Sequence, residues 1–174
     1  MKILVAVASK HGGTQGIAEA IAAELRTQNL AVDLHDMQDI LIDVGQYDAV
    51  ILGSAVYAGN WLPEAKHFID LNHPELSRLP VWLFSSGPLG TVNPQPQVDP
   101  GKLVTNIGDV AVRDHKVFVG RLDPAGLGLG ERLMSKVVGA PAGDFRNWDE
   151  IRAWARGVAS ECVGGMSLVH QPTS

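Results

Sequence analysis

The chain has 174 residues, of which 45% are apolar and 19% charged, and 14 Lys and Arg against 19 Asp and Glu give a formal net charge of −5. This length and apolar content suit one globular domain and exclude a disordered or acidic-tail protein. The mildly acidic balance argues against a nucleic-acid partner, which usually needs a basic surface. A single cysteine, Cys162, excludes a disulfide framework and a zinc cluster built on thiolates.

The start of the chain carries no recognisable export signal. Only six apolar residues, 3–8, follow Met1 and Lys2, which is too short for the apolar part of a signal peptide. No later apolar run has the length of a membrane span. We therefore expect a cytoplasmic protein without a membrane span.

Apolar runs of strand length alternate with segments of helical period along the chain. Residues 3–8 form a continuous apolar run, which is typical of a parallel strand covered on both faces. The third strand is predicted to end at Gly53 and Ser54, where the apolar run stops. The four later strands are predicted at residues 31–34, 49–52, 81–84 and 117–119.

Helices are predicted between these strands. Apolar residues recur every three or four positions from Ile17 to Leu25. A second helix is predicted to have Asn60 as its cap and Trp61 as its first residue, with Pro63 tolerated in the first turn. Further helices are predicted to begin at Asp99-Pro100, at Asp123-Pro124 and at Asn147, the last with Glu150 three residues on.

Five strands separated by helices predict right-handed crossovers and a parallel sheet. The expected fold class is therefore α/β, with three layers: a five-stranded parallel sheet in the order 2-1-3-4-5 and helices on both faces. Residues 1–163 are expected to form this domain, and residues 164–174 a flexible C-terminal tail.

The loops after the first, third and fourth strands should converge, because ligands of such sheets bind beyond the carboxyl ends of the strands, near the reversal in strand order. In the first loop, glycines let backbone N–H groups approach an anion, and the dipole of the following helix favours negative charge. An alternative is a tight turn with Thr14 as a helix cap. The candidate residues of this loop are Ser9, Lys10, His11, Gly12, Gly13 and Thr14.

The other two loops offer an aromatic wall and a polar edge. A planar ligand could stack on Tyr57 or Trp61, although Trp61 could instead cover the edge of the core, and the third loop could be an ordinary Gly/Pro turn. Together with an anion cradle, these loops describe a phosphorylated flat cofactor. Their candidate residues are Ala55, Val56, Tyr57, Ala58, Gly59, Asn60 and Trp61 in the second loop, and Ser85, Ser86, Gly87, Pro88, Leu89 and Gly90 in the third.

From Met1 to about Val163 the chain resembles the flavodoxin family. Its first loop is similar to a Ser-x-x-Gly-x-Thr phosphate loop at Ser9, Gly12 and Thr14. The resemblance implies a flavodoxin-like fold that binds FMN, with the first loop around the phosphate and the next two around the isoalloxazine ring. Within the family, the chain is similar to flavodoxin-domain proteins related to menaquinone-dependent protoporphyrinogen oxidase, through residues 53–59, 84–86, 119–120 and 143–148.

The resemblance implies an FMN-dependent oxidoreductase of the protoporphyrinogen-oxidase-like group. No nucleophile–base pair, carboxylate pair or metal-site spacing is evident, so no catalytic side chain and no metal are predicted, and the chemistry would lie on the flavin. The alternatives are a flavodoxin-type electron carrier and a non-redox binding module that has lost the flavin. The expected partner is a redox protein or a small electron donor or acceptor such as a quinone or porphyrinogen, with a homodimer as a further option.

Overall fold

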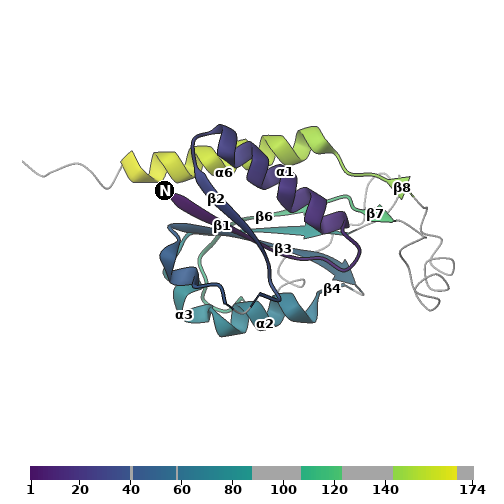
Figure 1. The fold of residues 1–174 in the computed structure, drawn as a ribbon, viewed down its shortest axis with the longest axis horizontal. Helices are drawn as coiled ribbons and strands as arrows, with labels where there is room; N and C mark the ends of the chain where they lie inside the picture. The colour runs from purple at the N-terminus through teal and green to yellow at the C-terminus, as the bar shows by residue number, and fades with distance from the viewer. Residues whose placement is uncertain (40, 58, 88–106, 123–142, 168–174) are drawn as a thin grey trace, which may run out of the picture.

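A parallel β-sheet lies between two layers of helices (Figure 1). The computed structural model describes residues 1–39, 41–57, 59–87, 107–122 and 143–167. In chain order the described elements are β1 (Lys2–Ala8), α1 (Gly13–Thr27), β2 (Ala31–Asp36), the 3-10 helix η1 (Val44–Gln46), β3 (Ala49–Tyr57), β4 (Asn60–Trp61), α2 (Pro63–Leu71), α3 (His73–Leu76), β5 (Val81–Ser86), β6 (Val112–Phe118), β7 (Arg121–Leu122), β8 (Gly143–Asp144) and α6 (Trp148–Ser167).

The order of the main sheet confirms the predicted topology. Its parallel strands run β2-β1-β3-β5-β6, which is the order 2-1-3-4-5 once the short strand β4 is set aside. Strand β4 pairs antiparallel with the end of β3, and β7 pairs with β8 as a separate two-stranded ribbon. Neither short pairing was predicted, because elements of two residues leave no hydrophobic period in a sequence.

Two apolar clusters fill the space on either side of the sheet, because successive side chains of a strand point to opposite faces. In β1, Ile3, Val5 and Val7 pack with α1 and α6, whereas the residues between them pack with α2 and α3 on the other face. Figure 1 shows these two helical layers. Burial on both faces explains why β1 reads as an unbroken apolar run.

Strand β3 continues past the predicted end at Gly53 and Ser54 and reaches Tyr57. Gly53 is an interior strand residue, and a Cβ at this position would overlap the ring of Phe84 on the neighbouring strand. The glycine therefore provides room for an aromatic ring and does not end the strand. The predicted end was wrong because a glycine that makes space in a sheet looks like a turn signal in a sequence.

The second helix begins later than predicted. Asn60 and Trp61 form β4, and α2 begins at Pro63 with Leu62 as its N-cap residue. The cap role of Asn60 was therefore wrong, and the first-turn position of Pro63 is confirmed.

In the C-terminal part of the described chain, one prediction is confirmed and one is wrong. The Asn147 side chain accepts a hydrogen bond from the Glu150 amide, which confirms the start of α6. This helix continues past Val163, the predicted end of the domain, to Ser167. Strand β6 begins at Val112, five residues before the predicted start. The helix starts predicted at Asp99-Pro100 and Asp123-Pro124 lie outside the described residues.

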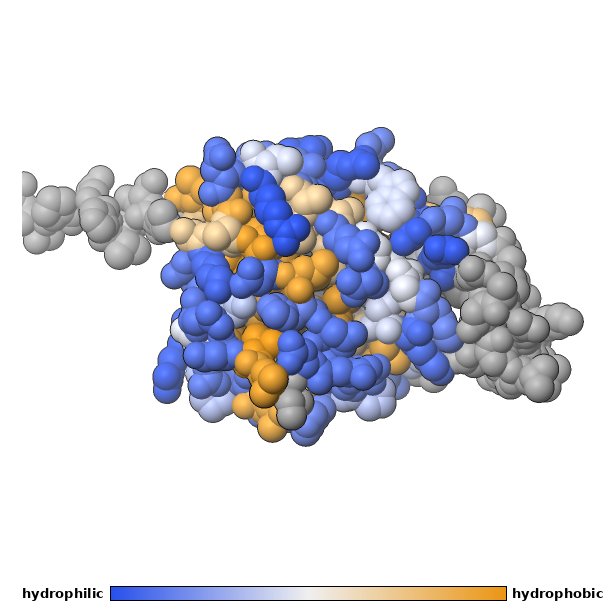
Figure 2. Space-filling view, viewed as in Figure 1, coloured by the Kyte–Doolittle hydropathy of each residue, from blue (hydrophilic) through white to orange (hydrophobic). Residues whose placement is uncertain are grey.

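The visible surface is mostly polar, with apolar areas in separate patches (Figure 2). The large apolar side chains exposed among the described residues are Leu41, Tyr57, Leu71 and Val163. Within the same ranges, no helix has both the length and the apolar character needed to cross a membrane.

The contact between Gly53 and Phe84 gives a stability prediction. We expect Gly53→Ala to lower the free energy of unfolding by about 2–3 kcal/mol, because the methyl group would overlap a buried ring. Urea denaturation measures this change. Gly157→Ala is the control, because no described atom lies within 4 Å of the added methyl group in helix α6, and its stability should be unchanged or higher. Equal stabilities of the two variants would contradict the packing role of Gly53.

Candidate functional site

The parallel register brings the ends of three strands to one edge of the sheet. Ala8 of β1 lies opposite Ser54 of β3, and Ser54 lies opposite Ser85 of β5. The segments that follow these residues are the three regions predicted to converge. The register therefore places the predicted candidate residues at a common edge, to the extent that the structure describes them.

The β1–α1 loop turns sharply into the helix. Gly12 is the N-cap residue of α1 with φ of 75°, a left-handed conformation that glycine adopts without strain. The Ser9 hydroxyl accepts a hydrogen bond from the Gln15 amide at 3.3 Å, and the Gly12 carbonyl accepts one from Gly16. The amides of Gly13 and Thr14 belong to the first helical turn and have no acceptor within the helix.

This loop has the donors that an anion requires. No described atom lies within 4 Å of the place a Cβ on Gly12 would take, so the loop is open on that side. Thr14 is 3% exposed and lies inside α1, whose cap residue is Gly12. The alternative prediction of a turn capped by Thr14 was therefore wrong. First-turn amides and the positive end of the helix dipole favour a bound phosphate or carboxylate here.

Tyr57 lies at the end of β3 and faces the β1–α1 loop. Its side chain is 40% exposed. The Lys10 ammonium lies 5.4 Å from the centre of the Tyr57 ring, and the His11 ring meets it edge-on at 6.4 Å. Two cationic or polar side chains of the first loop thus contact the aromatic residue of the second, as expected if both loops contribute to one site.

Trp61 has the packing role that the sequence left open as an alternative to stacking. It is 2% exposed, and its indole N–H donates a hydrogen bond to the Ser85 hydroxyl at 2.8 Å. His115 of β6 joins this pair, with its Nε2 atom 2.8 Å from the same hydroxyl and its ring edge-on to the indole. The Trp61 ring and the Ser85 hydroxyl are thus engaged with each other inside the protein, and Tyr57 is the exposed aromatic residue of the pair.

His115 was missed because the fifth strand was predicted too short to include it. Burial away from water lowers the pKa of His115 below its ordinary value of 6.5, and the charge of Asp114 opposes this shift only in part. A neutral imidazole nitrogen can accept a hydrogen bond from the Ser85 hydroxyl, while the hydroxyl oxygen accepts one from the Trp61 indole N–H. These hydrogen bonds therefore hold the end of β5 in place from the interior of the protein.

The third region is described in part. Ser86 is buried, and the Gly87 amide donates to the Phe118 carbonyl at 3.2 Å, so this amide is engaged with β6. In the second region, Ala55 and Val56 belong to β3, and Gly59 turns the chain into β4 with φ of 75°. The candidates Ala58, Pro88, Leu89 and Gly90 lie outside the described residues.

A segment far along the chain also reaches the β1–α1 loop. The Arg146 guanidinium donates to the Gly13 carbonyl at 3.1 Å, and the backbone of Arg121 lies near Gly13. Sequence reasoning missed this contact because 133 residues separate the partners. The one sequence signal for this segment was the run Gly143–Trp148, which is part of the resemblance described above.

Comparison with known proteins identifies a related family. The family model described as "Flavodoxin domain" matches residues 4–148. No curated protein matches significantly.

Solved structures share the fold at low identity. A flavodoxin from the domain Archaea is 18% identical with a TM-score of 0.60, covering 94% of this chain and 99% of that one. A flavodoxin from Streptococcus pneumoniae TIGR4 is 18% identical with a TM-score of 0.58, covering 92% and 99%. Rubredoxin oxygen:oxidoreductase from Desulfovibrio gigas is 16% identical with a TM-score of 0.59, covering 95% of this chain and 37% of that one. At these identities, the likeness concerns the fold.

The burial of His115 gives a pH prediction. A depressed folded pKa contributes stability that is present above the unfolded value near 6.5 and is lost as pH falls through the folded pKa. We expect His115→Gln, which keeps a hydrogen-bonding group for Ser85 but does not titrate, to lack this part of the acid-induced loss of stability. Urea denaturation at several pH values between about 7 and 5 compares the two proteins. Parallel pH profiles would contradict the burial of a neutral imidazole.

Proposed function

Since this chain belongs to the flavodoxin-domain family, we propose that it binds FMN at the carboxyl edge of its sheet and transfers electrons through it. The observation that carries the proposal is the contact of Lys10 and His11, in the loop that leads into the open start of α1, with the exposed Tyr57. FMN has the two chemical parts that these features suit, a phosphate and a flat aromatic ring.

The described residues fit the phosphate end of FMN. A phosphate monoester carries about −1.5 to −2 charges at neutral pH, and the amides of Gly13 and Thr14 present donors at the positive end of α1. The open space at Gly12 leaves room for the phosphate oxygens. Lys10 and His11 add side-chain donors on the same loop. Among the described residues, no group of three or more His, Cys, Asp or Glu side chains could hold a metal ion.

Tyr57 fits the ring end. Its partly exposed ring contacts Lys10 and His11 of the phosphate loop, so the ring of a flavin whose phosphate lies in that loop would come near it. Trp61 supports the β3–β4 turn from within the core and holds the end of β3 near Ser85. FMN supplies the redox chemistry when bound, and the protein binds and orients it and limits the access of water.

Two narrower functions follow from different observations. The resemblance of residues 53–59 and 143–148 supports an FMN-dependent oxidase of the protoporphyrinogen-oxidase-like group. The near-complete coverage of two flavodoxins favours an electron carrier that docks to redox proteins. Consumption of a quinone or porphyrinogen by the FMN-loaded protein supports the oxidase. Electron flow from a reductase to an acceptor protein, without either substrate being consumed, supports the carrier.

A third alternative is a non-redox module without flavin. Under the proposed function, the purified protein is yellow or becomes yellow with FMN, and dithionite bleaches it. A protein that stays colourless after incubation with FMN would contradict the proposal and favour the module. The cytoplasmic location, the domain boundary and a homodimer stay predictions.

A charge at Gly12 tests the phosphate site. We expect Gly12→Asp to weaken FMN binding about tenfold or more relative to Gly12→Asn, because only the carboxylate repels the phosphate. The asparagine variant is the matched control, since it has nearly the same shape and the same left-handed backbone requirement. Flavin fluorescence titrations measure both affinities. Riboflavin should bind the two variants alike, and an equal loss for FMN and riboflavin would place the phosphate elsewhere.

Removal of the Tyr57 ring tests the ring site. We expect Tyr57→Ala to weaken FMN and riboflavin by a similar factor of about three to ten, because the two flavins share the ring that stacks there. Tyr57→Trp keeps an aromatic face and should retain affinity for both. Unchanged affinity of the alanine variant would show that the flavin ring does not contact Tyr57.

A further inference from the structure

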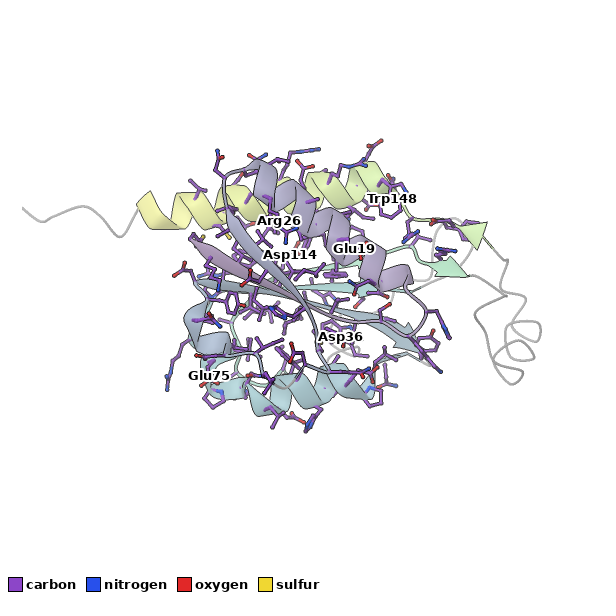
Figure 3. All side chains as sticks on the ribbon, in the orientation of Figure 1. Glu19, Arg26, Asp36, Glu75, Asp114 and Trp148 are labelled. Atoms are coloured by element: carbon purple, nitrogen blue, oxygen red, sulfur yellow. The ribbon has the colours of Figure 1, made fainter. Side chains whose placement is uncertain are left out.

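Arg146 lies in the loop between β8 and α6 and contacts the first turn of α1. Its Nη1 atom donates to the Gly13 carbonyl at 3.1 Å. This hydrogen bond joins the segment before α6 to the proposed phosphate loop. Trp148, at the beginning of α6, lies close to the beginning of α1 (Figure 3). The contact therefore comes from a segment outside the three loops that form the site.

The guanidinium is held from three sides. Its Nε atom donates to Asp144 Oδ1 at 2.8 Å, and Nη2 donates to the other oxygen of the same carboxylate. The ring of Trp148 lies 4.4 Å from the guanidinium carbon. The side chain is 7% exposed, and its hydrogen bonds hold the pKa of Asp144 below its usual value. Arg146 is therefore fixed in place, and Asp144 balances its charge.

The bond to Gly13 acts on the amide of Thr14. A peptide unit is planar, and its C=O and N–H point in opposite directions in the trans form. Fixing the Gly13 carbonyl therefore fixes the direction of the Thr14 N–H.

Gly16 provides an independent observation. A Cβ at this position would lie 2.5 Å from Arg146 Nη1, too close for two unbonded atoms. Glycine inside a helix is less favourable than alanine by about 1 kcal/mol. The guanidinium occupies the space that a side chain at position 16 would need, which explains the glycine.

We propose that Arg146 is a positioning residue for the flavin phosphate, acting through the Gly13 carbonyl to orient the Thr14 amide. This inference rests on the proposed function and names a determinant of selectivity for FMN over riboflavin. Because Asp144 balances the arginine charge, the effect comes from the geometry of the peptide, and a lysine does not replace it. A single ammonium group lacks the planar fork that engages Asp144 and Gly13 together.

Two variants test the role from different directions. Arg146→Lys keeps the charge and loses the fork. Gly16→Ala leaves both Arg146 and Asp144 in the chain and displaces the guanidinium from Gly13, so it answers the question even where the lysine variant does not fold. Gly157→Ala is the matched control, a glycine-to-alanine change in a helix with no described atom within 4 Å.

The readouts are the affinities for FMN and riboflavin by fluorescence titration, and the Thr14 amide resonance in the flavin-free protein. We expect Arg146→Lys and Gly16→Ala to weaken FMN about tenfold and riboflavin less than about twofold, and to shift the Thr14 resonance. Gly157→Ala should change none of these quantities.

Each of the following results would overturn the inference. Equal weakening of both flavins would mean a structural role only, and unchanged FMN affinity in both variants would mean no role. If the unmodified protein does not bind FMN, or binds riboflavin equally well, the inference falls together with the proposed phosphate site. Tight FMN binding by the unmodified protein with unaltered selectivity in the variants overturns the role of Arg146 alone.

Discussion

The parallel register that aligns Ala8, Ser54 and Ser85 is the constraint on which the candidate site depends. It fixes which residues follow each strand at the sheet edge, and so brings the β1–α1 loop to the end of β3. Strand β3 extends three residues beyond Ser54 and presents Tyr57 beside that loop. If one strand slipped by one residue in this register, each of its side chains would move to the other face of the sheet. The two parts of the site would then be separated.

Support for this edge comes from distant parts of the chain. The hydrogen bonds among Trp61, Ser85 and His115 join β4, β5 and β6 beneath the site. On the other side, Arg146 joins the start of α6 to the start of α1. The two helices are also linked along their length by the ion pair of Arg156 and Glu24. These contacts suit the proposed binding of a cofactor whose redox state changes.

The sequence predicted those features that depend on residues close together in the chain. The apolar run of β1, the helical period of α1 and the cap at Asn147 each depend on neighbours in sequence, and the structure bears them out. The strand end predicted at Gly53 was wrong because this glycine makes room for the ring of Phe84 on another strand. Trp61 has no sequence signal that separates stacking on a ligand from packing on Ser85, and the contact of Arg146 spans 133 residues. These features depend on tertiary contacts, which periodicity and spacing do not encode.

In the proposed function, the first turn of α1 binds the phosphate of FMN while Tyr57 borders its ring. The most direct measurement is a map of backbone amide resonances as FMN is added to the isotope-labelled protein. We expect saturable changes at one FMN per chain, largest at Gly13, Thr14 and Tyr57. Absence of a saturable change, or changes centred on the opposite end of the sheet near η1 and α3, would contradict it.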